Sequence, residues 1–129
     1  MNELEDIKGK VRVYCRIRPL SKSEKEDPEK AKPCYVKHDE FSLTVGLAGR
    51  PKDYIFDTVF DEDSTQSEVF EDTKRLVQSA IDGYNVCVFA YGQTGSGKTF
   101  TIQGDLEKGM PGLAPRSIIE LFDILKTMT

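Results

Sequence analysis

The chain has 129 residues, and its 18 basic and 22 acidic side chains give a formal net charge of −4. Charged residues make up 31% and hydrophobic residues 38%, a balance typical of a globular domain. No excess of basic charge points to nucleic acid, and no apolar run approaches the ~20 residues of a membrane span. Residues 1–6 are acidic and polar overall and do not resemble a secretory signal, which has a basic start and an apolar stretch. We therefore expect neither a nucleic-acid nor a membrane partner.

The first predicted element is a strand over residues 11–18, because apolar side chains recur at every second position. These side chains are Val11, Val13, Cys15 and Ile17. Pro19 ends the strand, since proline has no N–H to donate to a sheet. Residues 21–33 are highly charged, and we expect a solvated loop or a single helical turn there.

Two short strands are predicted at residues 41–45 and 53–56, joined by a turn that contains two glycines and a proline. A long helix follows, with Thr65 and Glu68 spaced as a capping box. Its apolar positions recur at helical spacing and predict one buried stripe. The stripe consists of Val69, Phe70, Thr73, Leu76, Val77, Ala80 and Ile81, and Gly83 is a plausible C-terminal cap.

Residues 86–91 form a continuous apolar run rich in β-branched and aromatic side chains, which predicts a buried strand of a parallel sheet. A glycine-rich loop, a helical start at 98–102 and a loop at 104–112 follow. Pro115 suits the first turn of a last helix. Its predicted apolar side contains Ile118, Leu121, Phe122 and Leu125.

The three cysteines, Cys15, Cys34 and Cys87, have no spacing typical of a zinc site or a redox CxxC pair. Two of them lie in apolar runs, and we expect buried, reduced thiols.

One motif carries chemistry, because eight consecutive residues match G-x-x-x-x-G-K-[ST] in full. They are Gly92, Gln93, Thr94, Gly95, Ser96, Gly97, Lys98 and Thr99. Glycines let the backbone approach phosphate oxygens, and successive N–H groups and the helix start attract anions. Lys98 is expected to reach the β- and γ-phosphates, and the Thr99 hydroxyl to bind Mg²⁺. A predicted strand before the motif and a helix after it favour a phosphate loop over an ordinary glycine-rich turn.

Hydrolysis would also need an acid that holds Mg²⁺ and a group that positions water. Asp57 and Asp61 follow weak predicted strands, and for both a capping role or a solvated loop is the favoured interpretation. We therefore predict no catalytic residue within these 129 residues.

Residues 89–99 closely resemble the phosphate loop of kinesins, and residues 13–20 resemble the first kinesin strand with its R-x-R-P motif. Residues 56–60, 83–85 and 112–116 resemble further kinesin segments in the same order. The resemblance implies the kinesin motor fold, an α/β fold with a P-loop NTPase-type mixed sheet flanked by helices, here incomplete. It implies that residues 1–8 end a neck and that residues 9–129 are the N-terminal part of the motor domain.

The same resemblance implies ATP and Mg²⁺ as cofactors, with Arg16, Pro19 and Tyr84 lining the adenine. Phe100 stands where the family often has histidine, so the likeness implies stacking without a hydrogen bond. For Arg18, contact with the nucleotide and pairing with a nearby acid stay equally open.

Residues 4–10 look like the neck of kinesins with a C-terminal motor, the kinesin-14 group, and residues 71–74 and 98–102 are similar to plant calmodulin-binding members. The resemblance implies a microtubule-stimulated ATPase that moves along microtubules, and hence a location in the cytoplasm on the cytoskeleton. It implies microtubule binding through segments beyond residue 129, a homodimer through an upstream coiled coil and possible calmodulin regulation of the full-length protein.

The kinesin switch motif N-x-x-S-S-R-S-H does not occur, and no D-x-x-G follows the loop. We therefore expect the 129 residues alone to be inactive, and the strand at 86–91 to lack the neighbours that come later in kinesins. Two alternatives remain: a truncated, non-catalytic nucleotide-binding fragment, and a P-loop phosphotransferase. The ~90 residues before the loop count against the phosphotransferase, in which the loop usually follows the first strand.

Overall fold

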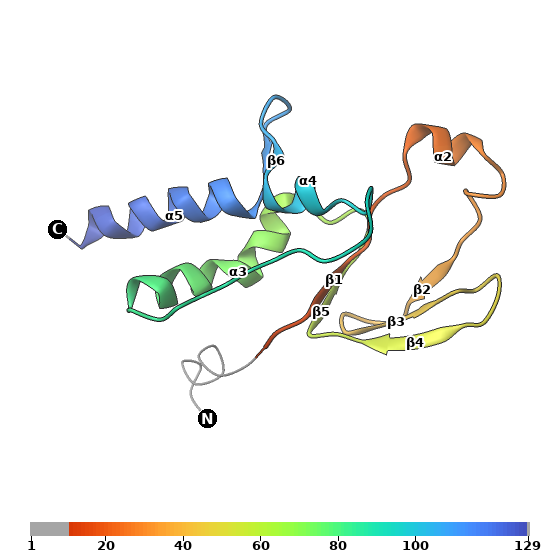
Figure 1. The fold of residues 1–129 in the computed structure, drawn as a ribbon, viewed down its shortest axis with the longest axis horizontal. Coiled ribbons are helices and arrows are strands. Elements are labelled where there is room, and N and C mark those ends of the chain that lie inside the picture. The colour runs from red at the N-terminus through yellow and green to blue at the C-terminus, as the bar shows by residue number, and fades with distance from the viewer. Residues whose placement is uncertain (1–10, 129) are drawn as a thin grey trace. The chain divides into compact units, whose positions relative to one another are not determined.

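A computed structural model describes residues 11–128 of the chain. Contacts divide these residues into two compact units, residues 11–64 and residues 65–128. Each unit contains both helix and strand, in the order shown in Figure 1. Among the helices of these residues, none has the length and apolar character needed to cross a membrane. The predicted neck at residues 4–10 lies outside the described residues.

In the first unit, β1 (Tyr14–Arg16) pairs in parallel with β5 (Thr58–Phe60) (Figure 1). The Val13 N–H donates to an Asp57 carboxylate oxygen at 2.7 Å, and the Asp57 N–H donates back to the Val13 carbonyl at 2.9 Å. The strand is shorter than predicted, and its expected buried face is incomplete, since Val11 and Val13 are exposed. A single parallel neighbour covers too little of residues 11–18 to bury every second side chain.

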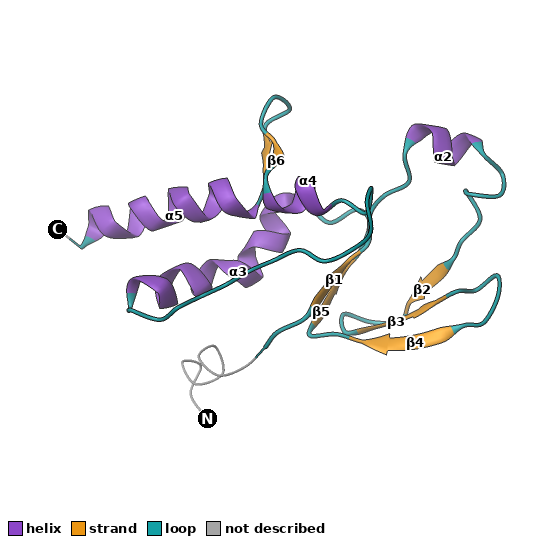
Figure 2. Ribbon diagram, viewed as in Figure 1, coloured by secondary structure: helices purple, strands orange, loops and turns teal. Residues whose placement is uncertain are grey.

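The second sheet of this unit is antiparallel and has the order β2–β3–β4 (Figure 2). Its strands are Tyr35–Lys37, Ser42–Val45 and Lys52–Ile55, which confirms the strands predicted at 41–45 and 53–56. Leu43, on the central strand, is only 3% exposed. Beside it the Thr44 hydroxyl donates to Asp53 at 2.5 Å and contacts His38 Nε2 at 2.6 Å. The sheet is therefore stabilised by one buried apolar side chain and a row of polar contacts.

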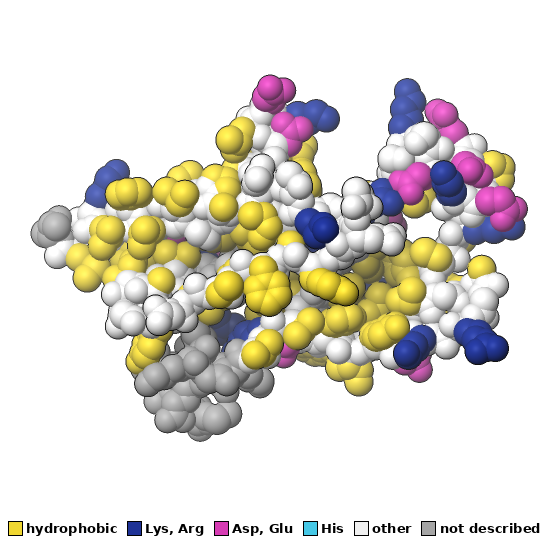
Figure 3. Space-filling model, viewed as in Figure 1, with side chains coloured by type: hydrophobic (Ala, Val, Ile, Leu, Met, Phe, Trp, Pro, Cys, Tyr) yellow, Lys and Arg dark blue, Asp and Glu magenta, His cyan; other side chains and the backbone are white. Residues whose placement is uncertain are grey.

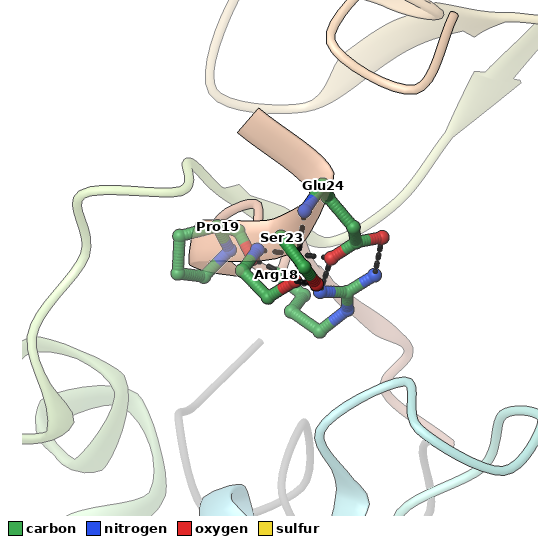
Figure 4. Close-up of polar contacts among 5 residues, drawn as sticks. Arg18, Pro19, Ser23 and Glu24 are labelled. Atoms are coloured by element: carbon green, nitrogen blue, oxygen red, sulfur yellow. Dashed lines mark hydrogen bonds and ion pairs between the residues drawn. The ribbon is translucent and has the colours of Figure 1, made fainter. Parts of the chain in front are cut away.

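The charged stretch after β1 forms one short helix, α2 (Lys22–Glu26), which confirms the predicted helical turn. Ser21 caps it: the Glu24 N–H donates to the Ser21 hydroxyl, and the Ser21 N–H donates to the Glu24 carboxylate. This complete capping box was not among the sequence predictions. The Glu24 carboxylate also accepts hydrogen bonds from both terminal nitrogens of Arg18 (Figure 4). The nitrogen–oxygen distances are 2.7 and 3.0 Å.

The second unit begins with α3 (Gln66–Ile81), whose N-cap Thr65 accepts from the Glu68 N–H at 3.2 Å. This is the hydroxyl half of the predicted capping box. The buried residues of α3 are Gln66, Val69, Phe70, Thr73, Val77 and Ser79, so much of the predicted stripe is confirmed, whereas Ala80 is exposed. Gly83 ends the helix with a φ of 103°, in agreement with its predicted capping role.

Residues 86–91 are extended but belong to no sheet within residues 11–128 (Figure 2). The prediction of a buried strand is therefore wrong for the described chain. Phe89 is 80% exposed and Tyr91 97% exposed. A strand exists only where a neighbour accepts its hydrogen bonds, and no segment of the described chain supplies one here.

The phosphate motif leads into α4 (Lys98–Ile102), as predicted. The predicted loop at 104–112 instead contains a small hairpin of β6 (Gly104–Asp105) and β7 (Met110–Pro111). Its strands have two residues each, too few for the alternation by which a sequence reveals a strand. Sequence reasoning therefore missed the hairpin.

The last helix, α5 (Leu113–Thr127), packs against α3, and Pro115 lies in its first turn as predicted. Its predicted apolar side is largely exposed, with Ile118, Phe122 and Leu125 accessible and Leu121 half-buried. In Figure 3 hydrophobic side chains gather along this helix. The amphipathic pattern predicted the helix correctly but not its burial.

Two further expectations need correction. Cys15 is half-buried, whereas Cys34 and Cys87 are exposed, so the expectation of buried thiols is wrong for these two. The described residues are mixed α/β, as expected, but their three sheets are small and none contains the run before the phosphate motif. The larger P-loop NTPase-type sheet stays a prediction.

Candidate nucleotide-binding site

The glycines of the predicted phosphate loop adopt conformations that other residues rarely adopt. Gly95 and Gly97 have φ angles of 84° and 100°, in the left-handed region. A Cβ added at Gly92 would lie 2.5 Å from the Ser96 hydroxyl oxygen, so a side chain at this position would require Ser96 to shift. The Ser96 N–H donates to the Gln93 carbonyl at 3.1 Å and closes the turn. The backbone conformation of the loop therefore favours glycine at Gly95 and Gly97.

A shallow concavity of about 460 Å³ lies against the loop, lined by Thr94, Gly95, Gly97, Lys98, Thr99 and Phe100. A Cβ added at Gly95 or Gly97 would meet no atom within 4 Å, so the backbone there faces open space. Lys98 brings a cation to this concavity, and Thr99 brings a hydroxyl. A phosphate chain with bound Mg²⁺ fits such a donor set, since ammonium and N–H groups bind phosphate oxygens and a hydroxyl binds Mg²⁺.

Backbone N–H groups at the start of α4 are also free of backbone partners. The first N–H groups of any helix have no intrahelical acceptor. Within residues 11–128, no backbone carbonyl accepts from the amides of Lys98 and Thr99. The N-cap is Gly97, which has no side chain to cap them. These amides therefore remain available to an anionic ligand in the concavity.

Gln66 on α3 forms a hydrogen bond to α4 that sequence reasoning did not predict. Its side chain is buried, at 7% residue exposure. Its Nε2 donates to the Phe100 carbonyl at 2.7 Å and lies 3.4 Å from the Met110 carbonyl. Gln66 shares the helical face of Phe70 and Thr73, so a polar residue on a predicted buried stripe was the signal that could have identified it.

Gly112 and Arg116 connect the β6–β7 hairpin to α4 and α5. A Cβ added at Gly112 would lie 2.6 Å from the carbonyl oxygens of Thr101 and Ile102, so this backbone lies directly on the end of α4. The Gly112 N–H donates to the Gln103 carbonyl at 3.1 Å. Arg116 Nε donates to the Pro111 carbonyl at 2.8 Å and ties α5 to the hairpin.

The residues predicted to line the adenine belong to both units. Phe100 lines the concavity with the phosphate loop, and Tyr84 follows the cap of α3, where its N–H donates to the Ser79 carbonyl. Arg16 and Pro19 belong to the unit of residues 11–64. Burial lowers the pKa of the Arg16 guanidinium, which donates to the Ser64 carbonyl at 3.5 Å. Adenine binding by these residues stays a prediction.

Arg18 pairs with an acid, which was one of its two predicted roles. Its two hydrogen bonds to Glu24 form a bidentate ion pair, the strong geometry for arginine and carboxylate (Figure 4). The Arg18 hydrogen bonds hold the pKa of Glu24 far below its usual value, and those from Ser21 lower it further. Burial contributes little, since both side chains are partly exposed.

The two weak candidate acids have structural roles. Asp57 accepts the Val13 N–H, as described above. Asp61 accepts from the Tyr35 hydroxyl at 3.2 Å and from the Glu62 N–H at 2.8 Å. Among residues 11–128, no group of three or more His, Cys, Asp or Glu side chains is arranged to hold a metal ion. The favoured interpretation of both acids was capping or a solvated loop, and the contacts show that each accepts hydrogen bonds within the unit of residues 11–64.

Comparison with known proteins gives the family. A family model described as microtubule binding matches residues 1–129, the whole chain. Kinesin-like protein KIN-14E of Arabidopsis thaliana is 57% identical over 97% of this chain, and KIN-14I of Oryza sativa subsp. japonica is 56% identical over 97%. Kinesin-like protein KIFC1 of Rattus norvegicus is 42% identical over 99%.

The chain spans only a small part of these relatives: 10% of each of the two plant proteins and 21% of the rat protein. The matches nevertheless cover nearly all of this sequence, including the loop and the R-x-R-P segment that suggested the family. The chain therefore belongs to the microtubule-binding family and is a kinesin-like sequence of the kinesin-14 kind.

Proposed function

We propose that residues 92–99 bind the phosphates of ATP, together with Mg²⁺, as part of a microtubule-based motor that couples ATP hydrolysis to movement. One observation carries the proposal: a complete G-x-x-x-x-G-K-T loop at the start of α4 lines an open concavity. Its glycines have the conformations that let backbone approach an anion.

Each group of the loop has a role in this proposal. The Lys98 ammonium neutralises charge on the β- and γ-phosphates, and the amides of Lys98 and Thr99 donate to phosphate oxygens. The Thr99 hydroxyl is the ligand that this chain offers to Mg²⁺, a cation that prefers oxygen. Bound Mg²⁺ would supply positive charge that offsets the negative charge of the phosphates. In this proposal, these 129 residues bind and orient the phosphates of ATP.

The motor role rests on the relatives rather than on the loop. The family is described as microtubule binding, and the similar proteins are named kinesin-like. We extend the proposal to adenine contacts by Arg16, Pro19, Tyr84 and Phe100, and to a location on microtubules in the cytoplasm. Dimer formation through a coiled coil and regulation by calmodulin are predictions from the same likeness.

Calorimetric titration with MgATP tests the phosphate loop. Lys98→Ala should weaken binding by about 1.5–3 kcal/mol, the range for a charge-assisted hydrogen bond, or roughly 10- to 150-fold. Removing Mg²⁺ should also weaken binding. Lys108→Ala, on the exposed turn of the hairpin in the same unit, is the matched control and should bind as the unchanged protein does. Equal binding by Lys98→Ala would exclude the proposed loop.

A further inference from the structure

The helix that bears Lys98 and Thr99 is too short to hold itself in place. α4 has five residues, little more than one turn. Helix nucleation is unfavourable, and helices well below ~12 residues are marginal without tertiary contacts. The position of the phosphate loop is therefore set by whatever holds α4 from outside. The described residues 65–128 contain two such supports, the Gly112 backbone and the Gln66 side chain.

Gln66 supplies α4 with a hydrogen bond from outside the helix. The Phe100 carbonyl lies in the last turn of α4, where carbonyls commonly accept from groups outside the helix. Gln66 Nε2 donates to that carbonyl at 2.7 Å, one residue after the loop ends at Thr99. The same nitrogen lies 3.4 Å from the Met110 carbonyl on β7. The side-chain amide of Gln66 thus links α4 to the β6–β7 hairpin.

Gln66 lies on the buried face of its own helix. Gln66 is the first residue of α3, a helix of 16 residues that buries Phe70 and Thr73 on the same face. The residue is 7% exposed, so water can replace its hydrogen bonds only poorly. Losing a direct hydrogen bond to the last turn of α4 removes one of the contacts that hold this short helix. Loss of the amide should therefore move or loosen α4 rather than leave it unchanged.

We propose that Gln66 is a positioning residue for the phosphate loop, acting through the Phe100 carbonyl to orient Lys98 and Thr99. This inference rests on the proposed function of the loop and deepens it. Gln66 does not touch the nucleotide in this account. It fixes the end of α4, and α4 presents the ammonium and the hydroxyl toward the concavity.

The first test replaces the donor and keeps the length of the side chain. Gln66→Met should weaken MgATP binding about tenfold and speed hydrogen exchange at residues 97–103. Gln78→Leu is the matched control, since Gln78 is exposed on the same helix and its Nε2 bonds only locally, to Asp82 at 3.0 Å. The control should change neither quantity.

The second test asks whether the donor itself matters. Gln66→Glu keeps the shape, but a carboxylate cannot donate, and burial raises the pKa of such a carboxyl. Between pH 8 and 5.5 its protonation should restore one donor and bring MgATP binding back toward the unchanged protein, while Gln66→Met stays weak. The unchanged protein titrated at each pH corrects for the other charged groups nearby. They are Lys98 on α4, Asp105, Glu107 and Lys108 of the hairpin, Arg116, Glu120, Asp123 and Lys126 on α5, and Glu68, Glu71, Asp72, Lys74 and Arg75 on α3.

The outcomes separate the two proposals. If the unchanged protein binds MgATP and Lys98→Ala does not, but Gln66→Met binds within twofold of the unchanged protein, the role of Gln66 is overturned and the loop is not. If nothing binds, the proposed function fails, and exchange at residues 97–103 still decides whether Gln66 holds α4. Unchanged exchange there, or exchange that rises equally throughout α3 and α5, contradicts a positioning role.

Discussion

Two segments of this chain have strong strand patterns, and only one of them forms strands. Residues 42–55 contain β3 and β4, which pair in antiparallel register across a short turn. Residues 86–91 are more apolar, yet they pair with nothing in the described chain and expose Phe89 and Tyr91. The hairpin carries its own partner a few residues away. The apolar run before the phosphate loop depends on a partner from elsewhere.

The contrast shows what a strand pattern measures. Alternation and β-branched content describe how well side chains would fit a sheet, whereas a strand also needs a neighbour to satisfy its backbone. A turn supplies that neighbour locally in a hairpin. A parallel strand needs a crossover connection or a distant segment. A local partner should therefore make the β3–β4 hairpin less sensitive to changes in the second unit.

The largest expected effect is at Leu43. In the 129-residue chain, Leu43→Ala should cost about 2–5 kcal/mol of unfolding free energy, because it leaves a cavity in the centre of the sheet. Phe89→Ala should change stability by less than about 0.5 kcal/mol, since this ring is exposed. Urea denaturation measures both.

A matched control keeps this comparison clear. Leu47→Ala removes the same atoms as Leu43→Ala, but from a residue that is 38% exposed on the turn, and should have a much smaller effect. If Phe89→Ala were as costly as Leu43→Ala, residues 86–91 would be buried in solution, and the comparison would fail.

Thiol reactivity should distinguish the exposed run at residues 86–91 from the paired strand β1 of the first unit. Cys87 lies in the apolar run and is exposed, whereas Cys15 is half-buried on β1 and burial raises the pKa of its thiol. Because the thiolate is the reactive form, Cys15 should be alkylated at least about tenfold more slowly than Cys87 at neutral pH. Pulsed alkylation with mass spectrometry measures both rates. Exposed Cys34 is the internal standard, and protection of Cys87 relative to it would show that the run is covered.

The smallest expected effect is acid sensitivity at the Arg18–Glu24 pair. The pKa of Glu24 is lower in the folded chain, so its contribution to stability is complete above its ordinary pKa of 4.5 and disappears as the pH falls below it. Glu24→Gln should therefore lose less stability than the unchanged chain between pH 6 and pH 3. The difference in Tm should be less than about 5 °C, because the pair is partly exposed. Identical acid profiles would show that the ion pair does not persist in solution.

The predictable parts of the molecule were those whose cause lies within a few residues. The helix at 66–81, the helical start at 98–102 and the hairpin of β3 and β4 each follow from local periodicity, caps or turns. The exposure of Ile118 and Phe122 could not be predicted, because an amphipathic face does not specify what covers it. The role of Gln66 could not be predicted for a related reason. Its partner, the Phe100 carbonyl, is 34 residues away and belongs to the backbone.

The central claim is that residues 92–99 bind the phosphates of ATP. Backbone amide NMR during titration with MgATP tests it most directly, because each loop amide reports separately. We expect the largest, saturable chemical-shift changes at the amides of residues 92–99, and we expect them to vanish in Lys98→Ala. The claim would be contradicted if millimolar MgATP left these amides unchanged, or if saturable shifts appeared only outside the loop.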